Sequence, residues 1–142
     1  MDLEIVDQLK DGRKSANAIA KELGISHNTV NRRIEKMTQA DILKITALVD
    51  TNEIPGHQLA LLGIILNSRD LAQKATEISQ LNGVIGAGVV TGRYDIIAIV
   101  MLNQELNLLK FQTIELAKVE NISFTETFIM YKTAGLKFPY SL

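Results

Sequence analysis

The sequence predicts an α+β protein in two parts, an N-terminal helix-turn-helix (winged-helix-like) domain and a C-terminal ferredoxin-like βαββαβ domain. Residues 1–39 contain three short segments with helical spacing of apolar residues, separated by glycine and serine. From residue 58 onward, strand-like and helix-like segments alternate in the order β-α-β-β-α-β. We therefore expect a helix-turn-helix domain with a following strand at 1–50, a linker at 51–57 and the second domain at 58–142.

The composition is typical of a soluble globular protein, with 46% apolar and 22% charged residues in a chain of 142. No apolar run approaches the roughly 20 residues that span a bilayer, and the acidic first residues do not resemble a signal peptide. The lack of cysteine excludes disulfides, thiolate zinc sites and a cysteine nucleophile. His27 and His57 stand apart from other ligands, so we expect no metal site and no cofactor. We expect a cytoplasmic protein without a membrane segment.

Three helices are predicted in the first forty residues. Leu3, Val6 and Leu9 recur at helical spacing and should form the apolar stripe of the first helix, with Ile5 at its flank. Gly12 is expected to end this helix, since glycine readily takes the left-handed conformation at a helix C-terminus. Ser15 is the expected N-cap of the second helix and Ser26 that of the third. The predicted buried stripe of the third helix consists of Val30, Ile34 and Met37.

The connection between the second and third helices has the helix-turn-helix pattern. Two helices joined by so short a turn as Gly24-Ile25-Ser26 must cross at a steep angle. A steep crossing needs a small residue where the backbones approach, and Ala20 is placed to meet Val30. The glycine allows the sharp turn, and Ile25 should fill the gap beneath it. We therefore expect the third helix to be a recognition helix.

The polar face of the third helix predicts contact with double-stranded DNA. Net charge is −1 for the whole chain, and opposite charges balance in residues 1–41, so bulk charge gives no such indication. Asparagine and arginine, however, make bidentate hydrogen bonds to adenine and guanine edges, while Arg33 and Lys36 suit phosphates. The predicted DNA-binding residues are Ser26, Asn28, Thr29, Asn31, Arg32, Arg33 and Lys36. The alternative interpretation is a solvated polar face on a small helical bundle.

In the second part, strands are predicted at 58–67, 84–91, 94–102 and 122–131, and helices at 70–81 and 104–118. Gly92-Arg93 fits a two-residue hairpin turn. Before this domain, the β-prone residues 42–49 should form a strand that braces the helix-turn-helix.

The last strand has two rows of alternating side chains. Ile122, Phe124, Phe128 and Met130 are expected to pack under the helices. The other row, which contains Ser123, Thr125, Thr127 and Ile129, suggests a sheet face that another subunit covers. Glu126 falls in the apolar row, which leaves either a bulge or a salt bridge to account for it.

Several motifs together carry a family resemblance. They are Asp11-Gly12-Arg13, Ile19-Ala20-Lys21-Glu22-Leu23-Gly24-Ile25-Ser26, Thr29-Val30, Arg32-Arg33-Ile34 and Thr91-Gly92-Arg93-Tyr94-Asp95. In these motifs the chain resembles the Lrp/AsnC family of bacterial and archaeal regulators, also called feast/famine regulatory proteins. The resemblance implies homodimers formed through the sheets, which assemble further to tetramers or octamers. It also implies that a small-molecule effector, an amino acid or related metabolite, binds between dimers.

Carried over by position, the resemblance implies effector-binding residues at Thr91, Gly92, Arg93, Tyr94 and Asp95. A free backbone N–H at Gly92, the guanidinium of Arg93 and the carboxylate of Asp95 could together hold both charged ends of an amino acid. The alternative is that Gly92 serves only the turn, while Tyr94 and Asp95 stabilise the hairpin.

The function predicted from these features is sequence-specific transcription regulation, without catalytic residues or enzyme activity. One alternative is an enzyme similar to the sirohaem decarboxylases, for which the second domain offers only His57, Arg69 and Arg93. Another is non-specific architectural DNA binding, which a near-neutral N-terminal half disfavours because such affinity comes mainly from phosphate neutralisation. The operator, the effector, the sign of regulation and the final oligomer size are left open by the sequence.

Overall fold

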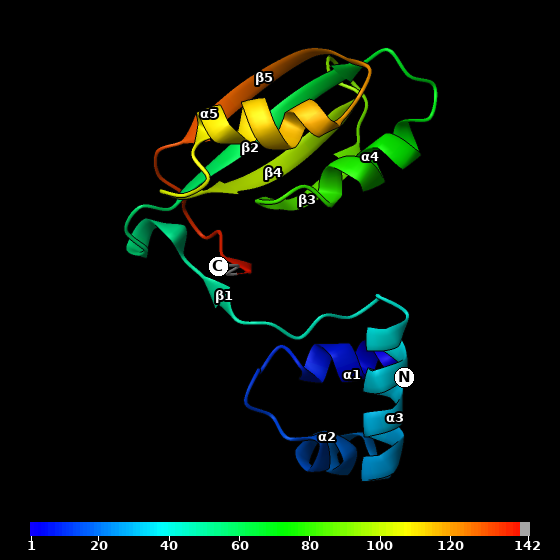
Figure 1. Ribbon diagram of the computed structural model, residues 1–142. Helices are drawn as coiled ribbons and strands as arrows, with labels where there is room; N and C mark the ends of the chain where they lie inside the picture. The colour runs from blue at the N-terminus through cyan, green and yellow to red at the C-terminus, as the bar shows by residue number, and fades with distance from the viewer. Residues whose placement is uncertain (140–142) are drawn as a thin grey trace. The chain divides into compact units, whose positions relative to one another are not determined.

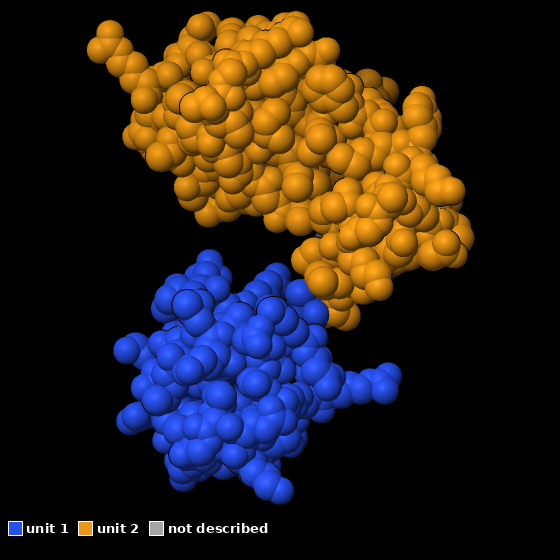
Figure 2. All heavy atoms as spheres, turned by 180° about the vertical axis from the view of Figure 1, so that it is seen from behind, with its two compact units in different colours: residues 1–46 blue, residues 47–142 orange. Residues whose placement is uncertain are grey.

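The computed structural model describes residues 1–139, and the chain forms two compact units, residues 1–46 and residues 47–142 (Figures 1 and 2). The division falls earlier than the predicted linker at 51–57. Part of that segment is a 3₁₀ helix, Thr51–Glu53, in which Thr51 is buried. The predicted linker residues therefore begin the second unit.

The first unit contains α1 (Asp2–Gln8), α2 (Ala16–Leu23) and α3 (His27–Gln39). Its core consists of Ile5, Ile19, Ala20, Val30 and Met37, with Ile34 and Leu43 among the residues packed against it.

Two expectations for α1 are wrong. Ile5, predicted at the flank of the apolar stripe, is fully buried, whereas Leu3, predicted within the stripe, is 83% exposed. The buried face of α1 is therefore centred on Ile5. The helix ends at Gln8 with a right-handed C-cap at Leu9, and Gly12 has no positive φ. The helix thus ends before it reaches Gly12, which does not serve as its C-cap.

The two predicted N-caps and the turn glycine of the helix-turn-helix connection are confirmed. The Ser15 hydroxyl accepts a hydrogen bond from the Ala18 N–H at 3.2 Å, and the Ser26 hydroxyl accepts one from the Thr29 N–H at 3.1 Å. Gly24 is left-handed with φ of 65°. Each serine accepts a hydrogen bond from an N–H that the helix itself leaves unpaired. The two serines therefore determine where α2 and α3 begin.

The second unit has a four-stranded antiparallel sheet covered by helices on one face (Figure 1). The strand order is β3-β4-β2-β5, which is the ferredoxin-like arrangement. The strands are β2 (Gln58–Leu66), β3 (Val84–Val89), β4 (Ile96–Leu102) and β5 (Ile122–Met130). The covering helices are α4 (Leu71–Ser79) and a second helix that begins as α5 (Leu108–Lys110).

The second covering helix is irregular and shorter than the segment predicted at 104–118. A π-helical turn (Phe111–Glu115) and a 3₁₀ turn (Leu116–Lys118) follow α5, so Phe111 and Leu116 both enter the core while Ile114 is exposed. Glu115 is buried and accepts hydrogen bonds from the Asn82 N–H at 3.1 Å and from Lys118 Nζ at 2.8 Å. The Lys118 ammonium holds the pKa of this carboxyl below its usual range.

The pairing of β5 with β2 reverses the predicted faces of β5. Ala60, Leu62, Ile64 and Leu66 of β2 belong to the core beneath the helices. Thr127 pairs with Leu62, and its hydroxyl accepts a hydrogen bond from Gln112 Nε2 at 3.3 Å, so Thr127 lies on the helix side. Phe124 and Phe128, 45% and 44% exposed, lie on the opposite face of the sheet, which we call the open face. Met130 pairs with Leu59 and lies on this same face, so the prediction that Phe124, Phe128 and Met130 pack under the helices is wrong.

A register shift explains this error in part. Between Ile65 and Leu66 the pairing partner moves from Phe124 to Ile122, so Ser123 is an extra residue. Ile122 therefore packs against the core although it shares its sequence parity with the phenylalanines. A prediction from strict alternation places Ile122 and the phenylalanines on one face, whereas the extra residue puts them on opposite faces of the sheet.

The loop between β3 and β4 is wider than the predicted two-residue hairpin. The Val90 N–H donates to the Asp95 carbonyl at 3.0 Å, which closes a loop of residues 91–94 with Gly92 at φ of 119°. The ring of Tyr94 lies over Gly63 of β2. A methyl group added at Gly63 would come within 2.8 Å of the ring carbons of Tyr94. Tyr94 cannot pair across the hairpin while it makes this contact.

The strand predicted at 42–49 is mostly absent. Only β1 (Leu48–Val49) forms, and it pairs with β6 (Phe138–Pro139) in the second unit and does not brace the helix-turn-helix. Beside it, the Asn52 amide donates to the Thr133 carbonyl at 2.9 Å and accepts from the Thr133 N–H at 3.0 Å. The segment after the first unit is thus held by the C-terminal part of the chain.

We predict that Gly63→Ala expels the Tyr94 ring and destabilises the protein by about 1–3 kcal/mol, because the added methyl overlaps ring atoms on a packed surface. Urea unfolding measures the loss of stability. Gly88→Ala is the matched control, since Gly88 lies in β3 of the same sheet and a methyl there meets nothing within 4 Å. Equal effects of the two substitutions would show that Tyr94 does not depend on Gly63.

Candidate nucleic-acid interface and effector loop

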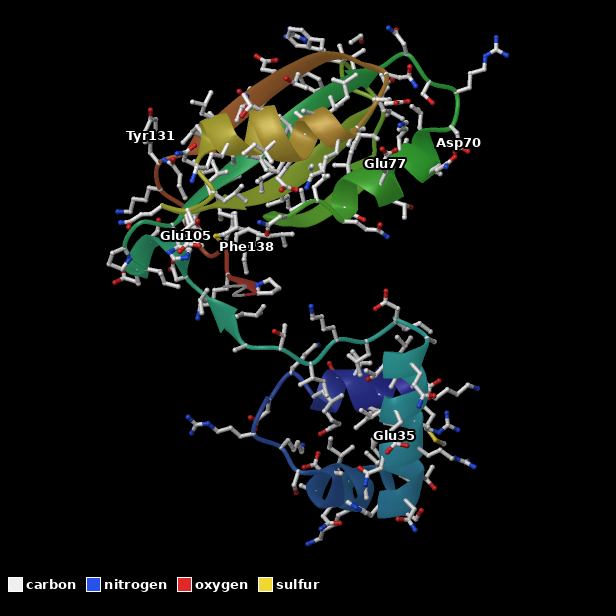
Figure 3. All side chains as sticks on the ribbon, in the orientation of Figure 1. Glu35, Asp70, Glu77, Glu105, Tyr131 and Phe138 are labelled. Carbon is white, nitrogen blue, oxygen red and sulfur yellow. The ribbon has the colours of Figure 1, made fainter. Side chains whose placement is uncertain are left out.

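The polar residues of α3 form one candidate site, on the first unit (Figure 3). Asn28, Arg32 and Lys36 are exposed, and Glu35 is exposed with them. Asn31 is half-buried and its amide donates to His27 Nε2 at 2.9 Å. The exposed Arg32 and Lys36 give this helix a cationic side with hydrogen-bond donors, which is the chemistry that base edges and phosphates accept.

Two of the predicted DNA-binding residues, Ser26 and Thr29, form hydrogen bonds at the N-terminus of α3. The hydroxyls of Ser26 and Thr29 lie 2.8 Å apart, and that of Ser26 also caps the helix. The helix N-terminus adds a partial positive charge near these residues.

Arg33 is held by the first helix. Its Nη1 donates to Asp2 Oδ1 at 2.6 Å, and the guanidinium holds the pKa of the Asp2 carboxyl below its usual range. The Nε of Arg33 is buried and has no hydrogen-bond partner among residues 1–139. Asp2, Arg32, Arg33 and Lys36 line a pocket of about 380 Å³. Sequence reasoning missed Asp2, whose role depends on a contact between two helices.

The loop between β3 and β4 is the second candidate site. Thr91, Gly92 and Arg93 are exposed, whereas Tyr94 and Asp95 are half-buried.

Asp95 extends the pairing of β4 with β2 beyond the last regular pair. Its N–H donates to the Ile64 carbonyl at 2.9 Å, and its Oδ2 accepts from the Leu66 N–H at 2.8 Å. These two bonds join the end of the loop to β2, whereas the hairpin itself is closed by the Val90 N–H donating to the Asp95 carbonyl. The carboxylate is therefore engaged in the sheet, and Arg93 is the charged group that the loop presents.

Arg93 lies against side chains of the open face. Its guanidinium carbon is 5.6 Å from the centre of the Tyr94 ring, and its Nη2 is 3.8 Å from Glu126 Oε2. The Tyr94 ring meets that of Phe128 edge-on, with ring centres 6.4 Å apart. Glu126 thus forms a salt bridge, one of the two explanations that the sequence left open, while the irregularity of β5 lies elsewhere, at Ser123.

The residues proposed for a sirohaem-type enzyme are not brought together. His57 precedes β2, whereas Arg69 follows it and Arg93 lies at the same end as Arg69. A strand of this length separates its ends by roughly 25–30 Å. Within residues 1–139 there is no group of three or more His, Cys, Asp or Glu side chains that could hold a metal ion. In the same part of the chain, no helix has the length and apolar character that crossing a membrane requires.

The chain is similar to known regulators over nearly its whole length. A family model described as a helix-turn-helix domain matches residues 3–46. The regulatory protein AsnC of Haemophilus influenzae is 30% identical over 130 residues, which cover 90% of this chain and 87% of that protein.

Solved structures show the same fold. That of Escherichia coli AsnC has a TM-score of 0.66 and 28% identity, covering 95% of this chain and 93% of its own. A transcriptional regulator of Neisseria meningitidis, solved as a complex with L-Met, has a TM-score of 0.67 and 16% identity, covering 99% and 93%. With the helix-turn-helix, the ferredoxin-like sheet and these relatives together, the chain belongs to the Lrp/AsnC family of transcription regulators.

Proposed function

We propose that this regulator binds specific DNA sites as a homodimer or larger assembly, and that an amino acid or related metabolite modulates it. Membership of the family makes it a transcription regulator with a DNA-binding helix-turn-helix. The single observation that carries the sequence-specific part is the exposed face of α3, where Arg32 and Asn28 stand free of the core. We place its action in the cytoplasm, where bacterial and archaeal DNA lies.

In this proposal Asn28, Asn31 and Arg32 read base edges in the major groove, and Lys36 binds phosphate. Arg33 also binds phosphate, because a guanidinium has five donors and Asp2 takes one of them. Ser26 and Thr29 contribute through the capped helix start, whose N–H groups favour an anion.

The proposed dimer interface is the open face of the sheet. It carries the exposed Phe124 and Phe128 beside half-buried apolar residues of β2 and β4. A contiguous apolar surface of this kind is unfavourable in water and marks an interaction site. Its occupant is a second copy of the chain, since a twofold axis places the same patch on both partners. The two recognition helices then read half-sites one helical turn, or a multiple, apart. Further assembly of such dimers gives tetramers or octamers.

The proposed effector site is the loop from Thr91 to Asp95. The Neisseria relative supports an amino acid as ligand, since its structure is a complex with L-Met. In the present chain Arg93 is the exposed cation proposed for the ligand carboxylate, and Gly92 beside it is exposed, with nothing within 4 Å of the position a Cβ would take. Coupling between effector and DNA or assembly is typically about 1–3 kcal/mol.

We predict that Arg32→Ala costs about 1–3 kcal/mol in binding to a specific DNA site and relaxes base preference, because a bidentate contact to a base is lost. The measurement is fluorescence anisotropy with a duplex selected from a random pool, against unselected DNA. Arg13→Ala is the matched control, because it removes an equal charge from an exposed position outside α3. Equal losses in both variants, or no preference of the wild type for selected DNA, would favour non-specific packing of DNA.

We also predict that Gly92→Val blunts the response to the effector while dimers and DNA binding persist, because a β-branched residue is strained at φ of 119°. Light scattering of wild type and variant with each amino acid measures the response. Gly135→Val is the control, since Gly135 has a φ of 70° in a different loop. Loss of the dimer in Gly92→Val would mean that the loop is structural and that the proposed site is wrong.

A further inference from the structure

Arg93 already has a carboxylate partner within its own chain. Within residues 91–95 it is the sole cation, so it is the group that an anionic ligand would seek. Glu126 reaches it from β5, an element far away in the sequence, with 3.8 Å between Oε2 and Nη2. Any ligand carboxylate that binds Arg93 therefore competes with the carboxylate of Glu126.

The position of Glu126 follows from the register of the sheet. Glu126 pairs with Gly63 on the open face, and the Tyr94 ring occupies the space above that glycine. Tyr94 draws the loop over β2 and so brings Arg93 toward β5. Asp95, the acidic residue of the loop itself, accepts a hydrogen bond from the Leu66 N–H, so its carboxylate is bound to β2. Glu126 is consequently the carboxylate that the fold directs at Arg93.

The contact between Arg93 and Glu126 is loose. A separation of 3.8 Å exceeds the length of a hydrogen bond, and Glu126 Oε2 has no hydrogen-bond partner among the described residues although it is buried. Arg93 itself is largely exposed, so the ion pair is weak. A free carboxylate can approach the guanidinium along two parallel N–H groups, which gives shorter and stronger bonds.

We propose that Glu126 is an internal competitor for the effector carboxylate, an inference that rests on the proposed effector role of the loop. Without effector, Glu126 neutralises Arg93 and holds it against Tyr94. A bound amino acid takes Arg93 by its carboxylate and leaves the buried Oε2 of Glu126 without its cation. That penalty lowers affinity, so the protein responds only when its effector is abundant.

The test is isothermal titration calorimetry with each of the twenty amino acids on the full chain. The proteins are wild type, Glu126→Gln, Arg93→Gln and the double variant. We expect Glu126→Gln to bind the best amino acid about two- to fivefold more tightly. This gain should vanish in the Arg93→Gln background. It should also vanish when the amino alcohol of the same side chain replaces the amino acid. Glu120→Gln, which removes an exposed carboxylate just before β5, should match the wild type.

The remaining outcomes separate this inference from the proposed effector site. If Arg93→Gln loses binding but Glu126→Gln equals the wild type or binds more weakly, the effector site holds and internal competition is wrong. A gain that persists in the double variant would also overturn the competition, because it would act without Arg93. If Arg93→Gln binds as well as the wild type, or no amino acid binds wild type or Glu126→Gln, both the site and the inference fail.

Discussion

The pairing of β2 at the centre of the four-stranded sheet is the constraint on which the second unit depends. Its even-numbered residues Ala60 to Leu66 lie under the helices, and this assigns each residue that pairs with β2 in β4 and β5 to a face. A slip of one residue would exchange the two faces. The lack of a side chain at Gly63 on the open face then admits Tyr94, which shapes the loop after β3. Register thus places both the proposed interface and the proposed sensing loop.

Local signals were sufficient to predict most of the fold. The caps at Ser15 and Ser26 and the left-handed Gly24 involve residues close in sequence, so the turn between the two helices could be predicted in detail. The order of strands and helices likewise follows from the periodicity of apolar residues.

What could not be predicted depends on partners distant in sequence. The extra residue at Ser123 decides which row of β5 meets the helices, and no local pattern marks it. Leu48–Val49 finds its partner in Phe138–Pro139 at the other end of the chain. For the candidate sites, residue types were predictable, but their neighbours Asp2 and Glu126 were not, since each reaches an arginine from another element.

Both candidate sites share one electrostatic arrangement. In α3, Arg33 is held by Asp2, and Arg32 and Lys36 remain exposed nearby. In the loop, the guanidinium of Arg93 lies 3.8 Å from a carboxylate oxygen of Glu126 and 5.6 Å from the centre of the Tyr94 ring. In each case an anionic ligand of the arginine has to compete with a carboxylate of the same chain, which favours ligands that offer better geometry.

The proposed dimer requires that a second copy of the chain covers the open face of the sheet. The most direct measurement is the solution mass of the wild type and of Phe128→Glu, by light scattering coupled to size exclusion. We expect at least twice the chain mass of 15.7 kDa for the wild type and a shift toward a single chain for the variant. A wild type at 15.7 kDa, or a variant that assembles unchanged, would contradict it.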